Sequence, residues 1–172
     1  MILDVFLPKL FEKSLLQVDL VKLKVMRMKG IILDLDNTLV PWGSDEVSPE
    51  VLEWLRKGKK LGLKFCIISN ATKRSRFRRI HALTDIPIVP GALKPIGFGF
   101  RRAMALMKTE KKKTAVIGDQ IFADIWGANR LQLYSILVAP MTPREFFLTK
   151  LVSRNLEKLV WSYFRKKGKL TS

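Results

Sequence analysis

The sequence contains one cysteine, Cys66, and one histidine, His81, among its 172 residues. A single cysteine excludes an intramolecular disulfide framework, and it fits a protein kept in a reducing compartment. The same scarcity excludes a metal centre built from several His and Cys ligands. Cys66 lies inside an apolar segment and is expected to be buried, whereas His81 is expected to serve a structural purpose. No apolar run approaches the roughly 20 residues that a membrane-spanning helix needs.

Acidic residues are also scarce, because 15 Asp and Glu face 32 Lys and Arg, which gives a formal net charge of +17. Such a surface favours polyanions, meaning nucleic acid, an anionic membrane face or phosphorylated ligands, although a merely basic soluble protein is the alternative. Asp4 and Pro8 interrupt the N-terminal apolar stretch, so we expect no cleavable signal. The expected location is the cytoplasm, with membrane contact only from the surface, at its inner face.

Short apolar segments alternate with helical patterns between about residues 29 and 142. The segment SPEVLEWLRKGKKLG illustrates a predicted helix, with Ser48 as N-cap, Pro49 in the first turn and Gly62 at the end. Continuous apolar strands separated by helices indicate a parallel sheet covered on both faces. We therefore predict one α/β domain over residues 1–172, with a three-layer, doubly wound, Rossmann-like core at about 29–142.

Two flanks, residues 1–28 and 144–172, fall outside this alternation. The alternating residues Val21 to Met28 predict a strand or an extended arm. Residues 144–169 have the pattern of a basic amphipathic helix, which would either pack on the domain or lie on anionic lipid. The apolar stretch from Val5 to Leu16 raises the same two possibilities.

Polar residues follow the predicted strands where each one ends, and in a doubly wound sheet ligands bind at that edge. The residues expected there are Asp34, Asp36, Asn37, Thr38, Ser69, Asn70, Lys94, Asp119 and Asp124. An isolated DxD pair is a weak signal, but polar groups arriving from several segments are hard to explain as ordinary surface. The sequence therefore predicts a site at this edge.

This set of residues suits phosphoryl transfer. Crowded carboxylates repel one another unless a cation neutralises them, and all-oxygen ligands favour Mg²⁺. A lysine with a Ser/Asn pair would hold the phosphate oxygens, whose charge must be stabilised in the transition state. One aspartate would attack phosphorus, and a second would protonate the leaving alcohol and later deprotonate water.

The segments DLDNT, ISN, LKP and GDQIFAD resemble, in order, the four motifs of the haloacid dehalogenase-like phosphatases. The resemblance implies Asp34 as nucleophile and metal ligand, and Asp36 as general acid and base whose backbone carbonyl also binds Mg²⁺. It further implies substrate contacts or supporting and metal-binding positions for Thr38, Ser69, Asn70, Lys94, Asp119 and Asp124. In that scheme Lys94 balances the charge of the aspartyl-phosphate, Asp119 binds Mg²⁺ and Asp124 positions the water shell of the metal. Asp36 argues for a phosphatase, since dehalogenases lack the second aspartate.

The wider context looks most like the YqeG-type branch of subclass IIIA, which is similar to mitochondrial phosphatidylglycerophosphate phosphatase. The short segments after the first and second motifs leave no room for an inserted domain, so a nearly capless, open site is expected. The expected substrate is then phosphatidylglycerophosphate at a membrane surface. The alternatives are a phosphatase on a nucleic acid or nucleotide phosphate, and a non-enzymatic basic protein associated with RNA or the ribosome.

The basic run KRSRFRR, Lys73 to Arg79, follows the second motif directly. It is either a docking patch for an anionic substrate or surface, or a solvated helix face. Trp42 would line the site entrance or only shield it, whereas Trp54 and Trp126 are expected in the core. The runs at 57–60 and 111–113 precede strands, so they are expected at the opposite edge and away from the site.

Overall fold

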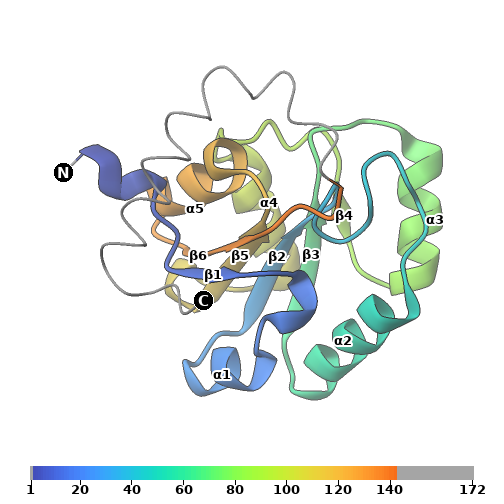
Figure 1. Cartoon of the computed structure of the whole chain (residues 1–172), viewed down its shortest axis with the longest axis horizontal. Coiled ribbons are helices and arrows are strands. Elements are labelled where there is room, and N and C mark those ends of the chain that lie inside the picture. Colours follow the sequence, from blue (N-terminus) through green and yellow to red (C-terminus); the bar gives the residue numbers. More distant parts are fainter. Residues whose placement is uncertain (1, 143–172) are drawn as a thin grey trace.

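A six-stranded, entirely parallel sheet forms the centre of the computed structural model, which describes residues 2–142 (Figure 1). The spatial order is β1-β6-β5-β2-β3-β4. The strands are β1 (Leu10–Glu12), β2 (Gly30–Asp34), β3 (Lys64–Ile68), β4 (Ile88–Val89), β5 (Thr114–Gly118) and β6 (Tyr134–Val138). The predicted doubly wound α/β fold is confirmed.

The order of the strands places a topological switch point at the centre of the sheet. From β2 the chain adds β3 and β4 on one side, then returns to place β5 and β6 on the other. β2 and β5 are hydrogen-bonded neighbours that leave the sheet in different directions, and ligands of such folds bind in the crevice formed there. Asp34 ends β2, and Asp119 directly follows β5.

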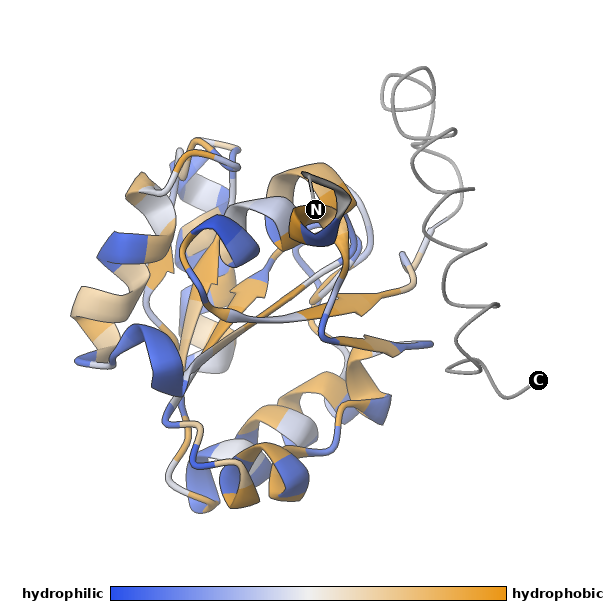
Figure 2. Cartoon of the chain, turned by 90° about the vertical axis from the view of Figure 1, so that its left-hand side faces the viewer, coloured by the Kyte–Doolittle hydropathy of each residue, from blue (hydrophilic) through white to orange (hydrophobic). Residues whose placement is uncertain are grey.

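Helices cover both faces of the sheet and give three layers (Figures 1 and 2). One face packs against α1 (Leu20–Val25), α2 (Pro49–Lys60) and α3 (Arg74–Thr84), and the other against α4 (Phe98–Met107) and α5 (Gly127–Arg130). Successive strand residues point to opposite faces, so Ile31 and Leu33 join the first core while Ile32 joins the second. The strands are consequently apolar along most of their length, as Figure 2 shows.

Local signals place the helices largely where the sequence predicts them. The Ser48 hydroxyl accepts a hydrogen bond from the backbone N–H of Val51 at 3.3 Å and caps α2, with Pro49 as its first residue. Ahead of α5 the chain forms one wide π-helical turn, η4 (Ile121–Trp126). Residues 121–130 therefore form two short helical pieces. Short 3₁₀ turns, η1 (Ile2–Phe6), η2 (Leu15–Gln17) and η3 (Lys111–Lys113), complete the described elements.

The N-terminal region differs from the expectation of a strand or extended arm over Val21 to Met28. Residues 20–25 form helix α1, because the Asp19 carboxylate caps it by accepting from the Lys22 backbone N–H at 3.0 Å. Leu20 and Leu23 lie on one side of this helix and are buried. The segment therefore follows the helical spacing of these residues and not the strand-like alternation of apolar and polar residues. Strand β1 pairs with β6 and adds an edge strand that the sequence did not indicate.

Cys66 and Trp54 are buried, as predicted, whereas Trp126 is only half-buried and stacks on Phe6. The Nδ1 atom of His81 lies 2.8 Å from the carbonyl oxygen of Ile86, in a local turn contact at the end of α3. Within residues 2–142 we find no helix whose length and apolarity would let it cross a membrane. The amphipathic helix predicted at 144–169 lies outside the described residues.

Candidate active site

The polar residues predicted at the carboxyl edge converge around the end of β2. Asp34 is the last residue of that strand and is buried, with 4% of its surface exposed. The next residues turn tightly: the N–H of Asn37 donates to the carbonyl oxygen of Val40 at 2.8 Å, and Asn37 has a φ of +62°. Asn tolerates this left-handed conformation better than most residues. The turn directs the Thr38 hydroxyl to Asp119, 3.4 Å away, across the switch point.

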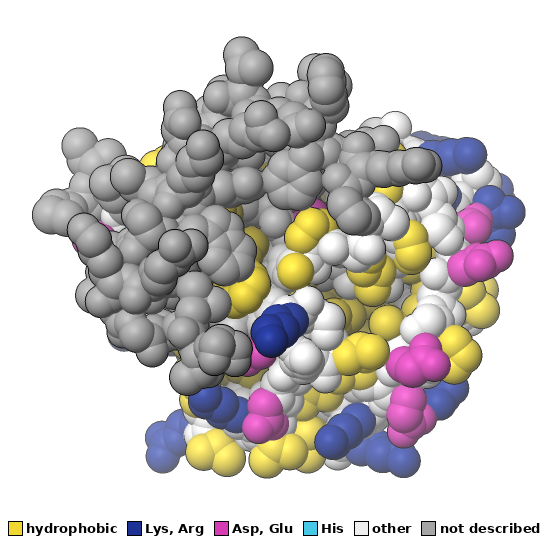
Figure 3. Space-filling view, in the orientation of Figure 1, with side chains coloured by type: hydrophobic (Ala, Val, Ile, Leu, Met, Phe, Trp, Pro, Cys, Tyr) yellow, Lys and Arg dark blue, Asp and Glu magenta, His cyan; other side chains and the backbone are white. Residues whose placement is uncertain are grey.

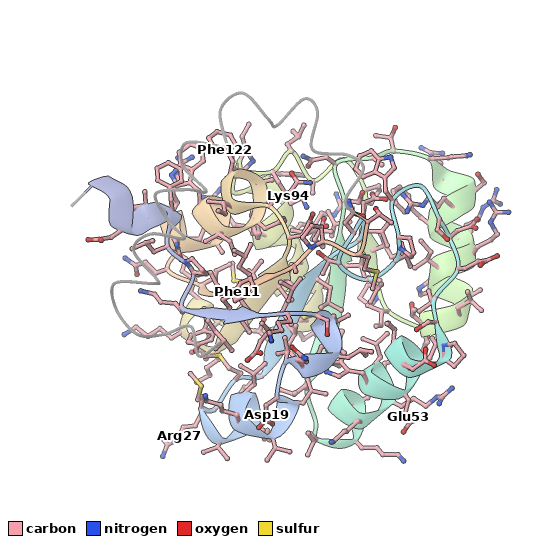
Figure 4. All side chains as sticks on the ribbon, viewed as in Figure 1. Phe11, Asp19, Arg27, Glu53, Lys94 and Phe122 are labelled. Atoms are coloured by element: carbon pink, nitrogen blue, oxygen red, sulfur yellow. The ribbon has the colours of Figure 1, made fainter. Side chains whose placement is uncertain are left out.

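Lys94 is the cation at the centre of the site (Figure 4). Its ammonium donates to Oδ1 of Asp34 and, at 2.8 Å, to Oδ1 of Asp124. All three side chains are almost completely buried. The second oxygen of Asp124 accepts from the backbone N–H of Gln120 at 3.2 Å, so this carboxylate is held from both sides. Asp124 therefore positions Lys94, which is a closer involvement than sequence reasoning assigned to it.

The two residues predicted after β3 occupy different positions. Ser69 is buried at the end of the strand, and its hydroxyl accepts from the backbone N–H of Ala71 at 3.2 Å. Asn70 is exposed, and its amide pairs with the backbone of Lys94 in both directions, at 2.8 Å and 3.2 Å. The side chain of Asn70 therefore fixes the loop that presents Lys94, a function that the motif spacing did not reveal.

Asp36 lies beside this cluster, with its carboxylate turned toward helix α3. Its Oδ1 accepts from the guanidinium of Arg76 at 2.6 Å and from the backbone N–H of Gly43 at 3.4 Å. Arg76 belongs to the basic run interpreted as a docking patch or a solvated face, yet only 7% of its surface is exposed. The sequence contained a signal for the burial of Arg76, because this residue lies on the same helical stripe as the apolar Ile80, four residues later. Sequence reasoning missed it.

Burial sets the protonation of the cluster. It raises the pKa of Asp34 to about 7, with the Lys94 ammonium opposing this shift and the neighbouring Asp124 carboxylate adding to it. Burial likewise raises the pKa of Asp119 to about 8, and the charges of Asp34 and Asp124 contribute. Burial disfavours the charged form of Lys94, but the carboxylates of Asp124 and Asp34 outweigh it and raise the pKa of the ammonium. When ionised, Asp34, Asp119 and Asp124 together carry three negative charges, and the single ammonium of Lys94 balances one of them.

The donor set fits a hard divalent cation. Carboxylate oxygens of Asp34, Asp119 and Asp124 lie within 4.8 Å of one another. Oδ2 of Asp34 is buried and is the one side-chain polar atom of this kind in the described part of the chain that has no hydrogen-bond partner. An orphaned buried carboxylate oxygen is costly unless a ligand or cation meets it. All-oxygen donors of this type are those that Mg²⁺ prefers. Asp36 contributes no carboxylate to this cluster.

Gly118, the last residue of β5, makes the close approach possible. A Cβ atom at this position would overlap the carboxylate of Asp124. Only glycine therefore lets the η4 turn bring Asp124 against the end of the strand and into contact with Lys94. The glycine of the GDQIFAD segment is thus a requirement of the site geometry.

Two comparisons with known proteins, one with protein families and one with single proteins, give matches to the sequence. Residues 40–132 match the family of haloacid dehalogenase-like hydrolases. Over 163 residues the chain is 38% identical to the probable phosphatase YqeG of Bacillus subtilis (strain 168), covering 95% of this chain and 94% of that protein. The family match begins at residue 40, after Asp34 and Asp36, whereas the alignment with the Bacillus protein extends over nearly the whole chain.

Solved structures show the same fold at low sequence identity. An uncharacterized protein from Listeria monocytogenes serotype 4b superposes with a TM-score of 0.53 at 19% identity, covering 76% of this chain and 99% of that one. A putative beta-phosphoglucomutase from Thermotoga maritima superposes with a TM-score of 0.50 at 14% identity, covering 72% and 91%. At these identities the likeness concerns the arrangement of sheet and helices.

Proposed function

Because the chain belongs to the haloacid dehalogenase-like hydrolase family, we propose that it is a Mg²⁺-dependent phosphomonoester hydrolase that works through an aspartyl-phosphate. The observation that carries this proposal is the environment of Asp34. One carboxylate oxygen is held by Lys94, and the other is buried without a partner at the ligand-binding edge of the sheet. A nucleophile must be fixed and yet keep one oxygen available, and Asp34 meets both conditions.

The reaction has two steps. An oxygen of Asp34 attacks phosphorus, the bond from phosphorus to the leaving oxygen breaks, and Asp36 gives its proton to that oxygen, which departs as an alcohol. Water then attacks the phosphorus of the aspartyl-phosphate while Asp36 takes its proton. The bond from phosphorus to Asp34 breaks, inorganic phosphate leaves, and both aspartates return to their starting states.

The remaining residues stabilise charge. Lys94 lies against Asp34 and would balance the phosphoryl oxygens once they arrive. Ser69 and Asn70, which follow β3, would contact the phosphoryl group, and Thr38 supports Asp119. Asp34, Asp119 and the backbone carbonyl of Asp36 would hold Mg²⁺, and its charge would then neutralise the phosphoryl oxygens. Asp124 lies within reach of the same cation and also keeps Lys94 in place, because its carboxylate accepts from the lysine.

The direct test is phosphate release from a panel of phosphomonoesters with and without Mg²⁺. The panel contains phosphatidylglycerophosphate in mixed micelles, sugar phosphates, nucleotides and a 5′-phosphorylated oligonucleotide. We expect Mg²⁺-dependent release, with the lipid as the preferred substrate. Preference for the nucleotide or oligonucleotide would reject the lipid but keep the phosphatase. Absence of release from every compound would contradict the proposed function itself.

Phosphatidylglycerophosphate at a membrane surface is the substrate that we propose, and the surroundings of the site support it. No cap domain is formed by residues 2–142, which suits a substrate carried on an extended surface. Six large apolar side chains, each at least 41% exposed, belong to segments that follow the carboxyl ends of strands: Trp42, Leu93, Ile96, Phe98, Phe122 and Met141. Apolar side chains around an open site suit contact with lipid.

Basic residues accompany these apolar side chains. Lys73 and Arg74 stand exposed at the start of α3, and Arg101 is exposed in the first turn of α4. Both helices begin at the edge of the sheet that carries the site. Figure 3 shows Lys and Arg side chains also at the lower margin, near α1 and α2, so the basic surface extends beyond the edge that carries the site. Cations beside exposed apolar groups favour an anionic bilayer over a neutral one.

Paired substitutions test this orientation. Phe98 and Leu106 are 49% and 50% exposed and lie at opposite ends of α4, so Leu106 is a matched control. Half-burying one Phe is worth roughly 1 kcal/mol, so Phe98→Ser should weaken binding to anionic vesicles by about 5-fold, and adding Phe122→Ser should weaken it further. Leu106→Ser should change it less than about 2-fold. Co-sedimentation with phosphatidylglycerol vesicles measures both, and equal effects at the two ends of α4 would contradict this membrane orientation.

A further inference from the structure

One arginine of helix α3 is turned into the protein. The neighbouring basic residues Arg74 and Arg78 are exposed, whereas Arg76 lies on the stripe that also buries Phe77 and Ile80. Arginine is almost never fully buried unless its charge is paired. The contacts of the buried Arg76 guanidinium must therefore compensate for the free energy lost when it is removed from water.

Those contacts join Arg76 to the segment that follows β2. Its guanidinium donates to Oδ1 of Asp36 at 2.6 Å, and it donates twice to the carbonyl oxygen of Ser44, at 2.9 Å through Nε and 2.6 Å through the terminal nitrogen. The side chains of both members of the ion pair are largely buried, with 9% and 15% exposed. A planar guanidinium suits such a set of contacts, and an ammonium group would not reproduce them.

The hydrogen bonds distinguish the two oxygens of Asp36. Those found among the described residues, from Arg76 and from the Gly43 N–H, all end on Oδ1. Oδ2 is thereby left to exchange a proton. A carboxylate of an unsupported aspartate samples several rotamers, and a misplacement of about 1 Å can cost on the order of 10²-fold in rate.

We propose that Arg76 is a positioning residue for Asp36, which holds Oδ1 so that Oδ2 faces the leaving oxygen of the substrate. This inference rests on the proposed function and adds to it a residue outside the four motifs. The same arginine also holds the segment that follows the first motif against helix α3. Ser44 and Asp45, in the segment after the first motif, are tied to α3 by Arg76 and by the Arg79–Asp45 ion pair.

Leaving-group dependence separates this task from a merely structural one. Release of p-nitrophenol needs little protonation, whereas release of an alkyl alcohol such as glycerol needs an acid. In single-turnover measurements, Arg76→Gln should slow alcohol release from glycerol 1-phosphate by about 10- to 100-fold and p-nitrophenol release by less than about 3-fold. Arg76→Lys keeps the charge without the planar fork and should give an intermediate loss.

A double-mutant comparison tests whether Arg76 acts through Asp36. In the Asp36→Asn background, Arg76→Gln should slow alcohol release from glycerol 1-phosphate by less than about 2-fold further, since the group it positions is already gone. Arg79→Gln is the control, because it removes the neighbouring tie to the same segment and should leave both leaving-group rates within about 2-fold.

Three results would overturn the inference: equal losses with both leaving groups, a full Arg76→Gln loss that persists beside Asp36→Asn, or the same pattern from Arg79→Gln. Circular dichroism and thermal unfolding of each variant are recorded first, and Arg76→Lys carries the comparison if Arg76→Gln does not fold. Failure of the wild-type protein to release either alcohol would instead contradict the proposed function, so the two failures are distinguishable.

Discussion

Replacing Asp34 by Asn is expected to lower kcat for Mg²⁺-dependent phosphate release by at least about 10⁴-fold, the scale of loss seen when a nucleophile is removed. The substitution keeps the size of the side chain but removes the charge that attacks phosphorus. Stability should not fall, because burial and the neighbouring Asp124 already disfavour the charged form of Asp34. The expected phenotype is therefore a folded and inactive protein.

Trapping of the phosphorylated protein provides a second measurement. After acid quenching during turnover, mass spectrometry should show wild-type protein that is heavier by one phosphoryl group, carried on the peptide that contains Asp34. The Asp34→Asn variant should show no such phosphorylated protein. Glu53→Gln is a suitable control, because Glu53 is an exposed carboxylate paired with Arg56 on helix α2. Phosphate release that survives Asp34→Asn would show that the reaction does not pass through this residue.

The fold could largely be predicted because its signals are local. Apolar strand segments separated by helical segments indicated the parallel sheet, and Ser48 with Pro49 indicated the start of α2. The N-terminal region was harder, since β1 is three residues long and gains its identity only from pairing with β6. At Val21 to Met28 the alternation was misleading, because the Asp19 cap and the burial of Leu23 select a helix.

Predicting the site depended on topology. The carboxyl ends of parallel strands share one edge, so the alternation of strands and helices is enough to expect residues from separate segments together. The comparisons confirm the family to which the four motifs pointed. The side-chain contacts within the site could not be predicted from the topology of the sheet. The contacts of Lys94 with Asp124, of Asn70 with the Lys94 backbone and of Arg76 with Asp36 depend on side-chain directions that spacing does not encode.

Stability of the metal-free protein should depend on pH in the direction opposite to that of ordinary surface carboxylates. Burial raises the pKa of Asp34 from 3.8 to about 7, so between these values the folded state binds a proton that the unfolded state lacks. This contribution is fully present below about pH 4 and is lost as pH rises through about 7. Such a shift corresponds to on the order of 4 kcal/mol for Asp34, and Asp119 acts in the same direction.

Mg²⁺ should reverse this loss, because it binds the deprotonated carboxylates and competes with their protons. Without metal, the free energy of unfolding from urea titrations should fall between pH 5.5 and pH 8. The increase in melting temperature caused by Mg²⁺ should then be larger at pH 8 than at pH 6. Asp34→Asn with Asp119→Asn should abolish most of both effects, whereas Glu53→Gln should leave them unchanged. A metal-free protein that becomes more stable over this range would show that the carboxylate cluster is not protonated in the folded state. A Mg²⁺ effect independent of pH would show that its ligands are not the groups that lose protons.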